Sequence, residues 1–480
     1  MRRLVLGAAV AALTGLLPDR AAAQPRDPQP NDGTVTIPLT VSPAALPKPL
    51  TRLYLYPDYR DSQPGNRVQG LLRTFMEQDN FFANKENVEK REKWREMPLA
   101  DLPSDMREQA GIKVGIAYDD RPYTAFLGIA DKAARFTRIE WNEWFDLRHD
   151  GVYMLLPEVQ KLRALASAIV LRMRGEVKAG EFHRAVESAK TLFGMAQALE
   201  QHPTLIAGLV GGAIATMTLN VLEEMVQQPG CPNLYWALTD LPSPLLSLRT
   251  GLGGERVFLT AQFEPVLKAD RPLTEPELAR YLKYAEDITK FEEQKGPTPR
   301  QRYEAVARDP AKLAAARKRL IEFGTPKELA ESMPPLQAAL TDDIQQYDVQ
   351  RDELFKWANL PYWEFTAGFK RSEADLKNSA HYVLGPTLLP AIGKVRAVVA
   401  RLDQRVALLR AAEAVRLYAH SHNGELPPSL GAVGVPVPTD PVSGKSFTYE
   451  VKGGVVTVHG ENPVAGSPAH ARRYEIRIRK

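Results

Sequence analysis

Residues 201–222 constrain the fold more than any other segment, because they carry no formal charge. Small residues recur four positions apart within this segment, at Gly208/Gly212 and Gly211/Ala215, a spacing that lets two helix backbones approach closely. An uncharged helix of this length either crosses a membrane or lies inside a bundle of other helices. Glycines and threonines dilute its apolarity, and no Lys/Arg cluster flanks it, which argues against a membrane span. We therefore predict a helix that is buried in a helical core.

The residues that precede this segment predict a helical hairpin. Apolar residues recur every three or four positions, first over residues 155–173 and then over residues 182–199. That spacing places one apolar stripe on each of two α-helices. Gly180 supplies the break that a tight antiparallel turn requires. The uncharged helix follows, and we expect it to begin near Pro203 and to end before Pro229.

The first residues have the pattern of an export signal. Arginines at positions 2 and 3 precede an apolar run over residues 4–17, and alanines at 21–23 supply a small-residue cleavage site. The apolar run is shorter than a bilayer span requires. We therefore expect a signal peptide over residues 1–23 and a mature chain, without an integral membrane span, in the periplasm or outside the cell.

The composition is that of a globular protein without a strongly charged surface. Apolar residues make up 44% and charged residues 25% of the chain. Loss of residues 1–23 removes three of the 62 basic and one of the 58 acidic residues, so the mature net charge is +2. This balance gives no electrostatic reason to expect a nucleic-acid partner. Cys231 is the only cysteine, so the packed core rather than an internal disulfide has to hold the exported chain together.

The flanking segments predict a linker, a long helix and a small sheet. Seven prolines between residues 24 and 49 indicate a linker, and a sustained apolar stripe over residues 388–420 predicts a long helix. Alternating polar and apolar residues at 446–451, 455–458 and 473–479 predict three strands, the first two joined by a glycine turn. These strands indicate a three-stranded antiparallel sheet at the end of the chain.

The predicted fold class is therefore mainly α. It consists of a helical-hairpin, α-solenoid-like bundle with a small C-terminal α+β module. The expected regions are the signal peptide (1–23), a proline-rich linker (24–49), an N-terminal mixed helical region (50–150), a helical core domain (151–385), and the long helix with its β module (386–480).

Three blocks of the core carry a resemblance to a known family. They are residues 203–211 (PTLIAGLVG), 232–242 (PNLYWALTDLP) and 248–256 (LRTGLGGER). Together they resemble a family of large exported helical proteins from planctomycete-type bacteria. The resemblance covers residues 53–400. It implies a helical fold and export, but no chemistry, because that family has no assigned activity.

The end of the chain is similar to the globular end of type II secretion pseudopilins. The residues that carry this similarity are Val415 to Tyr418, Asn423-Gly424, Leu426-Pro427, Leu430, Asp440-Pro441 and Tyr449. The resemblance implies a helix, a glycine–proline turn, an Asp-Pro turn and a small sheet. In a pseudopilin the export helix is fused to the long helix, whereas here roughly 360 residues separate them. The resemblance therefore implies the shape of the module and no ligand residues.

One acidic and aromatic cluster is a candidate ligand site. Glu140 and Glu143 alternate with Trp141 and Trp144. Paired carboxylates beside aromatic rings suit carbohydrate, either for hydrolysis or for binding in a groove. The alternative is a set of core aromatics with a solvated acidic face.

Two other candidate sites lack the partners that their chemistry requires. His420 and His422 offer two metal ligands, but no third ligand stands near them in the sequence. Cys231 with His202 or His183 offers a nucleophile and a base, but no signature surrounds the cysteine. No serine-triad, zinc-protease or nucleotide motif is present in the sequence. We therefore predict neither a metal nor a cofactor.

These observations favour a non-catalytic exported structural or interaction protein of the cell envelope. Its partner would be a protein or an envelope component, bound in the grooves between stacked helices. One alternative is a hydrolase, acting on carbohydrate, with a site assembled near Trp141 and Trp144. The other is an accessory component of a secretion system, as the C-terminal resemblance implies.

Overall fold

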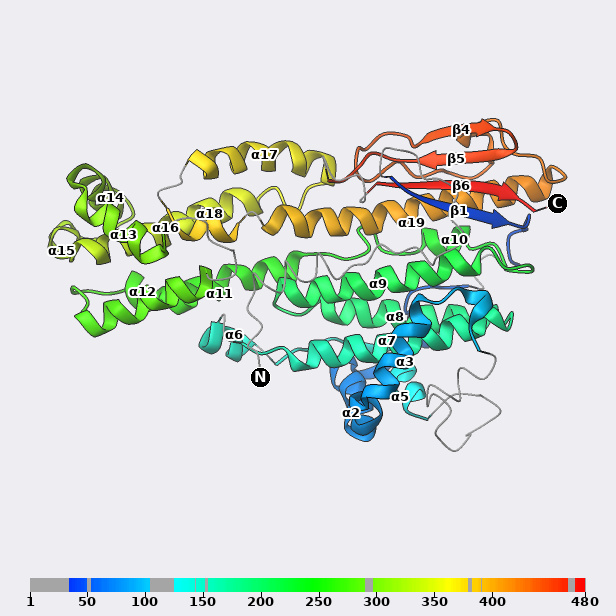
Figure 1. The fold of residues 1–480 in the computed structure, drawn as a ribbon, viewed down its shortest axis with the longest axis horizontal. Coiled ribbons are helices and arrows are strands. Elements are labelled where there is room, and N and C mark those ends of the chain that lie inside the picture. Colours follow the sequence, from blue (N-terminus) through cyan, green and yellow to red (C-terminus); the bar gives the residue numbers. More distant parts are fainter. Residues whose placement is uncertain are drawn as a thin grey trace.

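A computed structural model describes residues 34–49, 53–103, 125–142, 144–151, 154–289, 297–378, 382–389, 391–464 and 471–479. The signal peptide predicted for residues 1–23 lies outside these ranges. The described part is mainly helical and carries a small sheet module, as predicted. The molecule is elongated, with helices α9 (Leu205–Met225) and α19 (Ala391–Ser421) along its length (Figure 1).

The predicted hairpin is confirmed. Helices α7 (Pro157–Lys178) and α8 (Phe182–Glu200) pack on each other and on α9. Gly180 forms the turn between α7 and α8 with a φ of 73°. Thr204 caps α9, since its side chain accepts a backbone N–H in the first turn. The helix thus begins directly after Pro203, where the sequence placed its start.

Helix α9 is buried by its neighbours, which confirms the prediction for the uncharged segment. Among the described residues it alone is long and apolar enough to cross a membrane, and 78% of that window is buried. It contacts α7, α8, α19 and α11 (Arg249–Leu267). A Cβ added at Gly211 would lie 2.8 Å from the carbonyl oxygen of Ala196, so this glycine permits the close approach of α8 and α9.

The glycine cluster over residues 251–254 has a packing role. A Cβ added at Gly254 would lie only 1.6 Å from the carbonyl oxygen of Pro203. Helix α11 therefore rests directly on the backbone that leads into α9. A larger residue at position 254 would force the two segments apart.

The N-terminal helices lie along one side of the hairpin, beside α7 and α8 (Figure 1). Arg67 joins the region together, because its guanidinium donates 2.9 Å and 3.1 Å bonds to the carbonyl oxygen of Phe136. The elements of this region are β2 (Gln63–Asn66), α2 (Arg67–Ala83), α3 (Lys85–Glu96), α5 (Ala125–Ala133), β3 (Phe136–Arg138) and α6 (Trp144–Asp150), with β2 and β3 paired in parallel.

Helices α13, α14 and α15 form a distal arm at the end of the molecule opposite the sheet (Figure 1). Pro310 begins α14, which is capped by Asp309. A small separate cluster holds the arm on α16: Leu320, Ala330, Met333 and Ala338. The remaining helices are α10 (Tyr235–Thr239), α12 (Glu275–Thr289), α13 (Pro299–Arg308), α14 (Pro310–Glu322), α15 (Lys327–Ser332), α16 (Pro335–Phe355), α17 (Tyr362–Asn378) and α18 (Leu384–Leu388).

The sheet has four strands in the order β1-β6-β5-β4, which corrects the predicted three-stranded antiparallel sheet. Strands β4 (Thr448–Lys452), β5 (Val455–His459) and β6 (Arg472–Ile478) are antiparallel as predicted. The additional strand is β1 (Val35–Val41), which pairs in parallel with β6 and makes the sheet mixed. It lies inside residues 24–49, where the prolines indicated a linker. Its alternating apolar side chains are buried, which is why it adds to the sheet.

One face of the sheet packs on α19. Val456, Val458 and Ile476 are fully buried on β5 and β6, which contact that helix. The Tyr474 hydroxyl donates a 2.5 Å bond to Glu223 of α9, whose carboxylate also binds Arg405 of α19. One buried carboxylate thus ties the sheet to both long helices.

Candidate functional site

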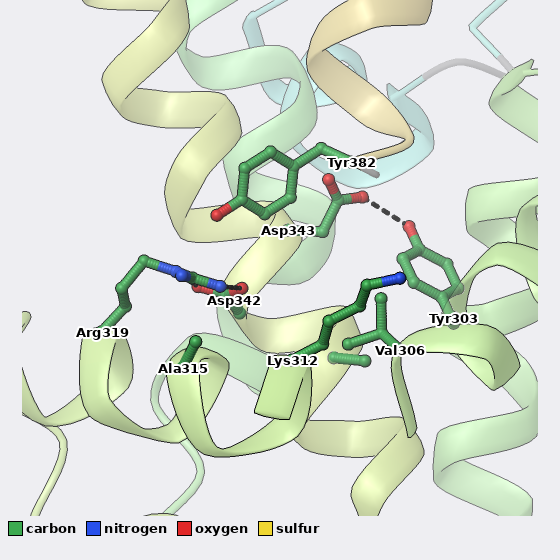
Figure 2. A pocket seen from close by; sticks show the side chains of 9 residues that line it. Tyr303, Val306, Lys312, Ala315, Arg319, Asp342, Asp343 and Tyr382 are labelled. Atoms are coloured by element: carbon green, nitrogen blue, oxygen red, sulfur yellow. Dashed lines mark hydrogen bonds and ion pairs between the residues drawn. The ribbon is translucent and has the colours of Figure 1, made fainter. Parts of the chain in front are cut away.

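The candidate site is a cavity beneath the distal arm, with a volume of about 240 Å³ (Figure 2). It lies where α13 and α14 cross α16 and the segment that leads into α18. Small side chains on α14 and α16 leave the space, and charged and aromatic side chains surround it. The lining residues are Tyr303, Val306, Lys312, Ala315, Arg319, Ala339, Asp342, Asp343 and Tyr382.

Asp343 has its carboxylate fully engaged. It accepts a 2.7 Å bond from the Tyr303 hydroxyl and bonds of 3.0 Å and 3.2 Å from the backbone N–H groups of Val383 and Leu384. Burial raises its pKa to about 6, although these bonds oppose the rise. The carboxylate thus holds the start of α18 against α16 and α13, which is a structural task.

Asp342, the preceding residue, is paired with Arg319 of α14. Its two oxygens accept guanidinium bonds of 2.8 Å and 2.7 Å. The same guanidinium lies 5.7 Å from the centre of the Tyr382 ring. This two-bond geometry fixes the angle between the arm and α16, and the charges of Arg319 and Asp342 neutralise each other.

Lys312 is the cavity's accessible cation. Its side chain reaches over the cavity toward Tyr303 (Figure 2). The ammonium is 3.5 Å from Asp309, and the side chain keeps 54% of its surface exposed. The cavity thus offers a solvated ammonium above apolar and phenolic walls, whereas its two carboxylates are already bonded. This arrangement suits binding of a small polar group better than acid–base catalysis.

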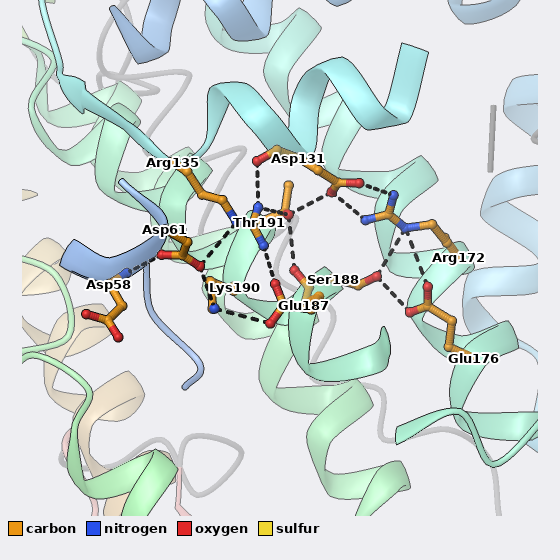
Figure 3. Close-up of polar contacts among 10 residues, drawn as sticks. All are labelled: Asp58, Asp61, Asp131, Arg135, Arg172, Glu176, Glu187, Ser188, Lys190 and Thr191. Carbon is orange, nitrogen blue, oxygen red and sulfur yellow. Dashed lines mark hydrogen bonds and ion pairs between the residues drawn. The ribbon is translucent and has the colours of Figure 1, made fainter. Parts of the chain in front are cut away.

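A second polar cluster joins α5, α7 and α8 (Figure 3). Arg172, which is 2% exposed, donates bonds of 2.8 Å and 2.7 Å to Asp131 and a 3.1 Å bond to Ser188. Ser188 in turn donates to the buried Glu176 at 2.7 Å, and Thr191 donates to Asp131 at 2.7 Å. Burial alone would raise the pKa of Asp131, but Arg172 and Thr191 hold that pKa below its usual value. We call this group the α7–α8 joint.

The joint continues to the surface through a second set of ion pairs (Figure 3). Lys190 is 2.7 Å from Asp61 and 3.2 Å from Glu187. Arg135 contacts the same two carboxylates, at 3.4 Å and 2.5 Å. These pairs connect segments far apart in the sequence and fix their packing. The joint contains the residue types of a catalytic site, but its members bond to one another.

The structure describes two side chains of the predicted ligand cluster, those of Glu140 and Trp141. Trp141 is buried, donates its indole N–H to the Ala198 carbonyl oxygen at 2.8 Å, and contacts the His202 ring edge-on. Glu140 is exposed, with its carboxylate 3.3 Å from Arg138. Glu143 and the side chain of Trp144 lie outside the described residues.

Among the other sequence candidates, Cys231 and His202 are buried packing groups, whereas His183, His420 and His422 are exposed. Cys231 is buried, which raises the pKa of its thiol to about 12 and disfavours a thiolate nucleophile. Burial lowers the pKa of His202 to about 4, and its ring nitrogen accepts the Thr204 N–H. His422 stacks on Tyr418, with ring centres 3.7 Å apart. In the part of the chain that the structure describes, no three His, Cys, Asp or Glu residues gather as a metal site.

Sequence reasoning missed the cavity, because its lining comes from residues far apart in the chain. Tyr303 and Asp343 lie forty positions apart, and Tyr382 follows almost forty positions later. One signal was available: Asp342 and Asp343 interrupt an apolar stretch at the start of α16. Two adjacent acids inside a buried helix require partners, which here are Arg319 and Tyr303.

Comparisons with protein-family models, with curated proteins and with solved structures find no match for this chain. The function is therefore inferred from the residues of the chain and from their geometry.

Proposed function

We propose that this protein is a non-catalytic, exported structural or interaction protein of the cell envelope. Its helical hairpins stack in an α-solenoid-like body, and the cavity beneath the distal arm contacts a protein or envelope component. The observation that supports the proposal is that the carboxylates of both polar clusters already have hydrogen-bond or ion-pair partners. At the cavity and at the α7–α8 joint alike, carboxylates are bonded to groups that they hold in place.

The distal arm supplies the surface for an interaction. Ile321 and Phe323 at the end of α14 are 38% and 49% exposed. Ile321 lies on the helix that carries Lys312 and Arg319 into the cavity, and Phe323 directly follows that helix. An arm with an exposed apolar end and an accessible ammonium favours a partner with an apolar group and a negative charge.

A capture experiment with matched variants tests the proposed binding. The tagged mature chain is compared with Lys312→Glu and with the control Lys318→Glu, which changes an exposed lysine outside the cavity on the same helix. We expect a bound envelope component, identified by mass spectrometry, that is lost with Lys312→Glu and retained with Lys318→Glu. Equal retention by all three proteins would contradict binding at the cavity.

Export is tested by fractionation and by sequencing of the mature N-terminus. We expect the chain outside the cytoplasm, beginning at Gln24. Replacement of Arg2 and Arg3 by glutamate removes the positive start of the signal and should retain the chain in the cytoplasm. A wild-type chain found in the cytoplasm with its first residues intact would refute this part of the proposal.

The hydrolase alternative is tested on a panel of envelope and storage polysaccharides. We expect no release of reducing sugar by the wild-type protein above that by Glu140→Gln. An activity that disappears in this variant would replace the non-catalytic proposal by the alternative one.

A further inference from the structure

The two edge strands of the four-stranded sheet, β1 and β4, differ in how they are protected from pairing with a further strand. On β1, Val35 donates to β6 and Val41 accepts from it, so the even-numbered residues between them face outward. Of these outward positions, Pro38 has no N–H, and the N–H of Thr40 donates to the Gln227 side chain at 3.3 Å. Proline and side-chain capping are devices that prevent a strand from pairing further. The β1 edge is therefore protected at Pro38 and Thr40, two of its three outward positions.

The edge formed by β4 has no such protection. In the described residues β4 pairs only with β5. A two-glycine turn, with φ values of 59° and 77°, joins Lys452 to Val455, so these two residues form the hydrogen-bonded closing pair. Pairing alternates along the strand, and Tyr449 and Val451 therefore direct their N–H and C=O groups away from β5. Two outward positions are available to another strand.

The side chains of β4 place one exposed apolar residue between two residues of opposite charge. Val451 stands opposite Val456, on the face of the sheet that packs on α19. Val456 is fully buried, but Val451 keeps 45% of its surface exposed. Glu450 and Lys452 lie on the opposite, solvent-facing side. One exposed apolar side chain is thus flanked by two opposite charges.

We propose that β4 is a dimerisation edge, which pairs antiparallel with β4 of a second copy and has Val451 on the twofold axis. The two Val451 residues then exchange both backbone hydrogen bonds and cover each other's exposed side chains. Glu450 of each copy stands opposite Lys452 of the other, in a non-hydrogen-bonded pair whose Cα atoms are about 4.5 Å apart. The strand is complementary to itself in hydrogen bonding, apolar surface and charge.

The charges select this register over its neighbour. A twofold axis at Glu450 would place the two Glu450 carboxylates directly opposite each other, which destabilises a strand pair. The axis at Val451 replaces that repulsion by two identical ion pairs. The resulting sheet is continuous across both copies and has a protected β1 strand at each end, which disfavours pairing beyond two copies.

Charge reversal tests the register. Glu450→Lys and Lys452→Glu each place like charges opposite each other twice, and each should weaken the dimer about tenfold or more in sedimentation equilibrium. The double variant Glu450→Lys/Lys452→Glu should dimerise as the wild type does. An equimolar mixture of the two single variants should form heterodimers, because every cross-strand pair is then attractive.

Two changes at Val451 test the backbone pairing. Val451→Pro removes an outward N–H and no intrachain strand bond, so the monomer should fold normally by circular dichroism and the dimer should be lost. Val451→Cys should form a disulfide-linked dimer on mild oxidation, because the paired Cα atoms would be about 5.5 Å apart. Thr448→Cys is the matched control, because the register places position 448 opposite Gly454 of the second copy. The two cysteines are then too far apart to form a disulfide.

Several results would overturn the proposal. A wild-type chain that stays monomeric at millimolar concentration has no such edge. A dimer that survives Val451→Pro uses another surface. Failure of the two charge variants to associate on mixing, while both remain folded, would exclude this register. Capture of a strand from a different protein at β4 would identify a different occupant.

Discussion

The α7–α8 joint and the cavity beneath the distal arm are built from the same kinds of side chain. Each has an arginine bound through two bonds to an aspartate, and each has a hydroxyl that donates to a carboxylate. In the joint, Arg172 is 2% exposed and its neighbours fill the space around it. At the arm, Arg319 is 28% exposed, and the small side chains of Ala315 and Ala339 leave a cavity beside it.

This difference shows that packing, rather than residue type, separates a filled polar cluster from one that borders a cavity. An ion pair enclosed by close-packed helices has no room for a ligand and acts as a joint. Arg319 and Asp342 form the same kind of ion pair next to the small separate core of the distal arm, and there the pair borders the cavity. Four comparisons, from the largest expected effect to the smallest, test this distinction.

The largest effect is expected at the joint. Arg172→Met leaves the buried carboxylate of Glu176 without its cation and should lower the free energy of unfolding by about 3–5 kcal/mol. Arg319→Met at the arm leaves the buried carboxylate of Asp342 without its cation, but this carboxylate borders the cavity, which water can enter, so the cost should be smaller, about 1–2 kcal/mol. Urea unfolding followed by circular dichroism measures both. Equal losses would show that the two arginines are equally enclosed.

The next test concerns the pH dependence of stability that arises from Glu255, a buried residue of α11. Burial raises the pKa of Glu255 from 4.5 to about 7, so the folded protein holds this proton more tightly than the unfolded chain does. This contribution to stability is fully present below pH 4.5 and is lost as the pH rises through 7. The loss amounts to about 3 kcal/mol. Glu255→Gln, which mimics the protonated acid, should flatten the stability profile between pH 4.5 and 7. Thermal unfolding across that range measures the slope, and an unchanged slope would contradict the assignment.

A smaller effect is expected at Asp343. Asn in place of this residue keeps one carbonyl oxygen and replaces the other by an N–H₂ group that faces donors. Asp343→Asn should therefore lower the free energy of unfolding by about 1–2 kcal/mol. Tyr303→Phe is the milder comparison, because it removes a single donor. Hydrogen exchange at Val383 and Leu384 should accelerate in the first variant only.

The smallest effect should come from filling the cavity. Ala339→Leu places a side chain in open space and should change the free energy of unfolding by less than about 1 kcal/mol. The same substitution at Ala189, which is fully buried in α8, should cost about 1–3 kcal/mol through overpacking. A matching cost at Ala339 would mean that the cavity is closed in solution.

Local sequence patterns predicted the helices well. The apolar spacing around Gly180 and the start of α9 just after its cap, Thr204, depend on residues within one or two turns. The same applies to β4, β5 and β6, which alternate clearly. Burial of α9 also followed from its lack of charge.

Contacts between distant segments were beyond the reach of these patterns. The prolines around β1 indicated a linker, and only the partner strand β6 at the other end of the chain reveals that residues 35–41 pair. The packing of the glycines at 251–254 against Pro203 could not be read from their spacing in the sequence. The cavity combines Tyr303, Arg319 and Asp343 from separate helices, so no local motif marks it.

The pairing of β1 with β6 imposes an order on the making of this molecule. The ribosome synthesises β1 before the helical core and β6 after it, so β1 has no partner strand while the helices are being made. During that interval its apolar side chains Ile37, Leu39 and Val41 have no sheet to join. A chain that stops short of β6 leaves β1 unpaired, so this sheet is complete only after the helical core has been synthesised.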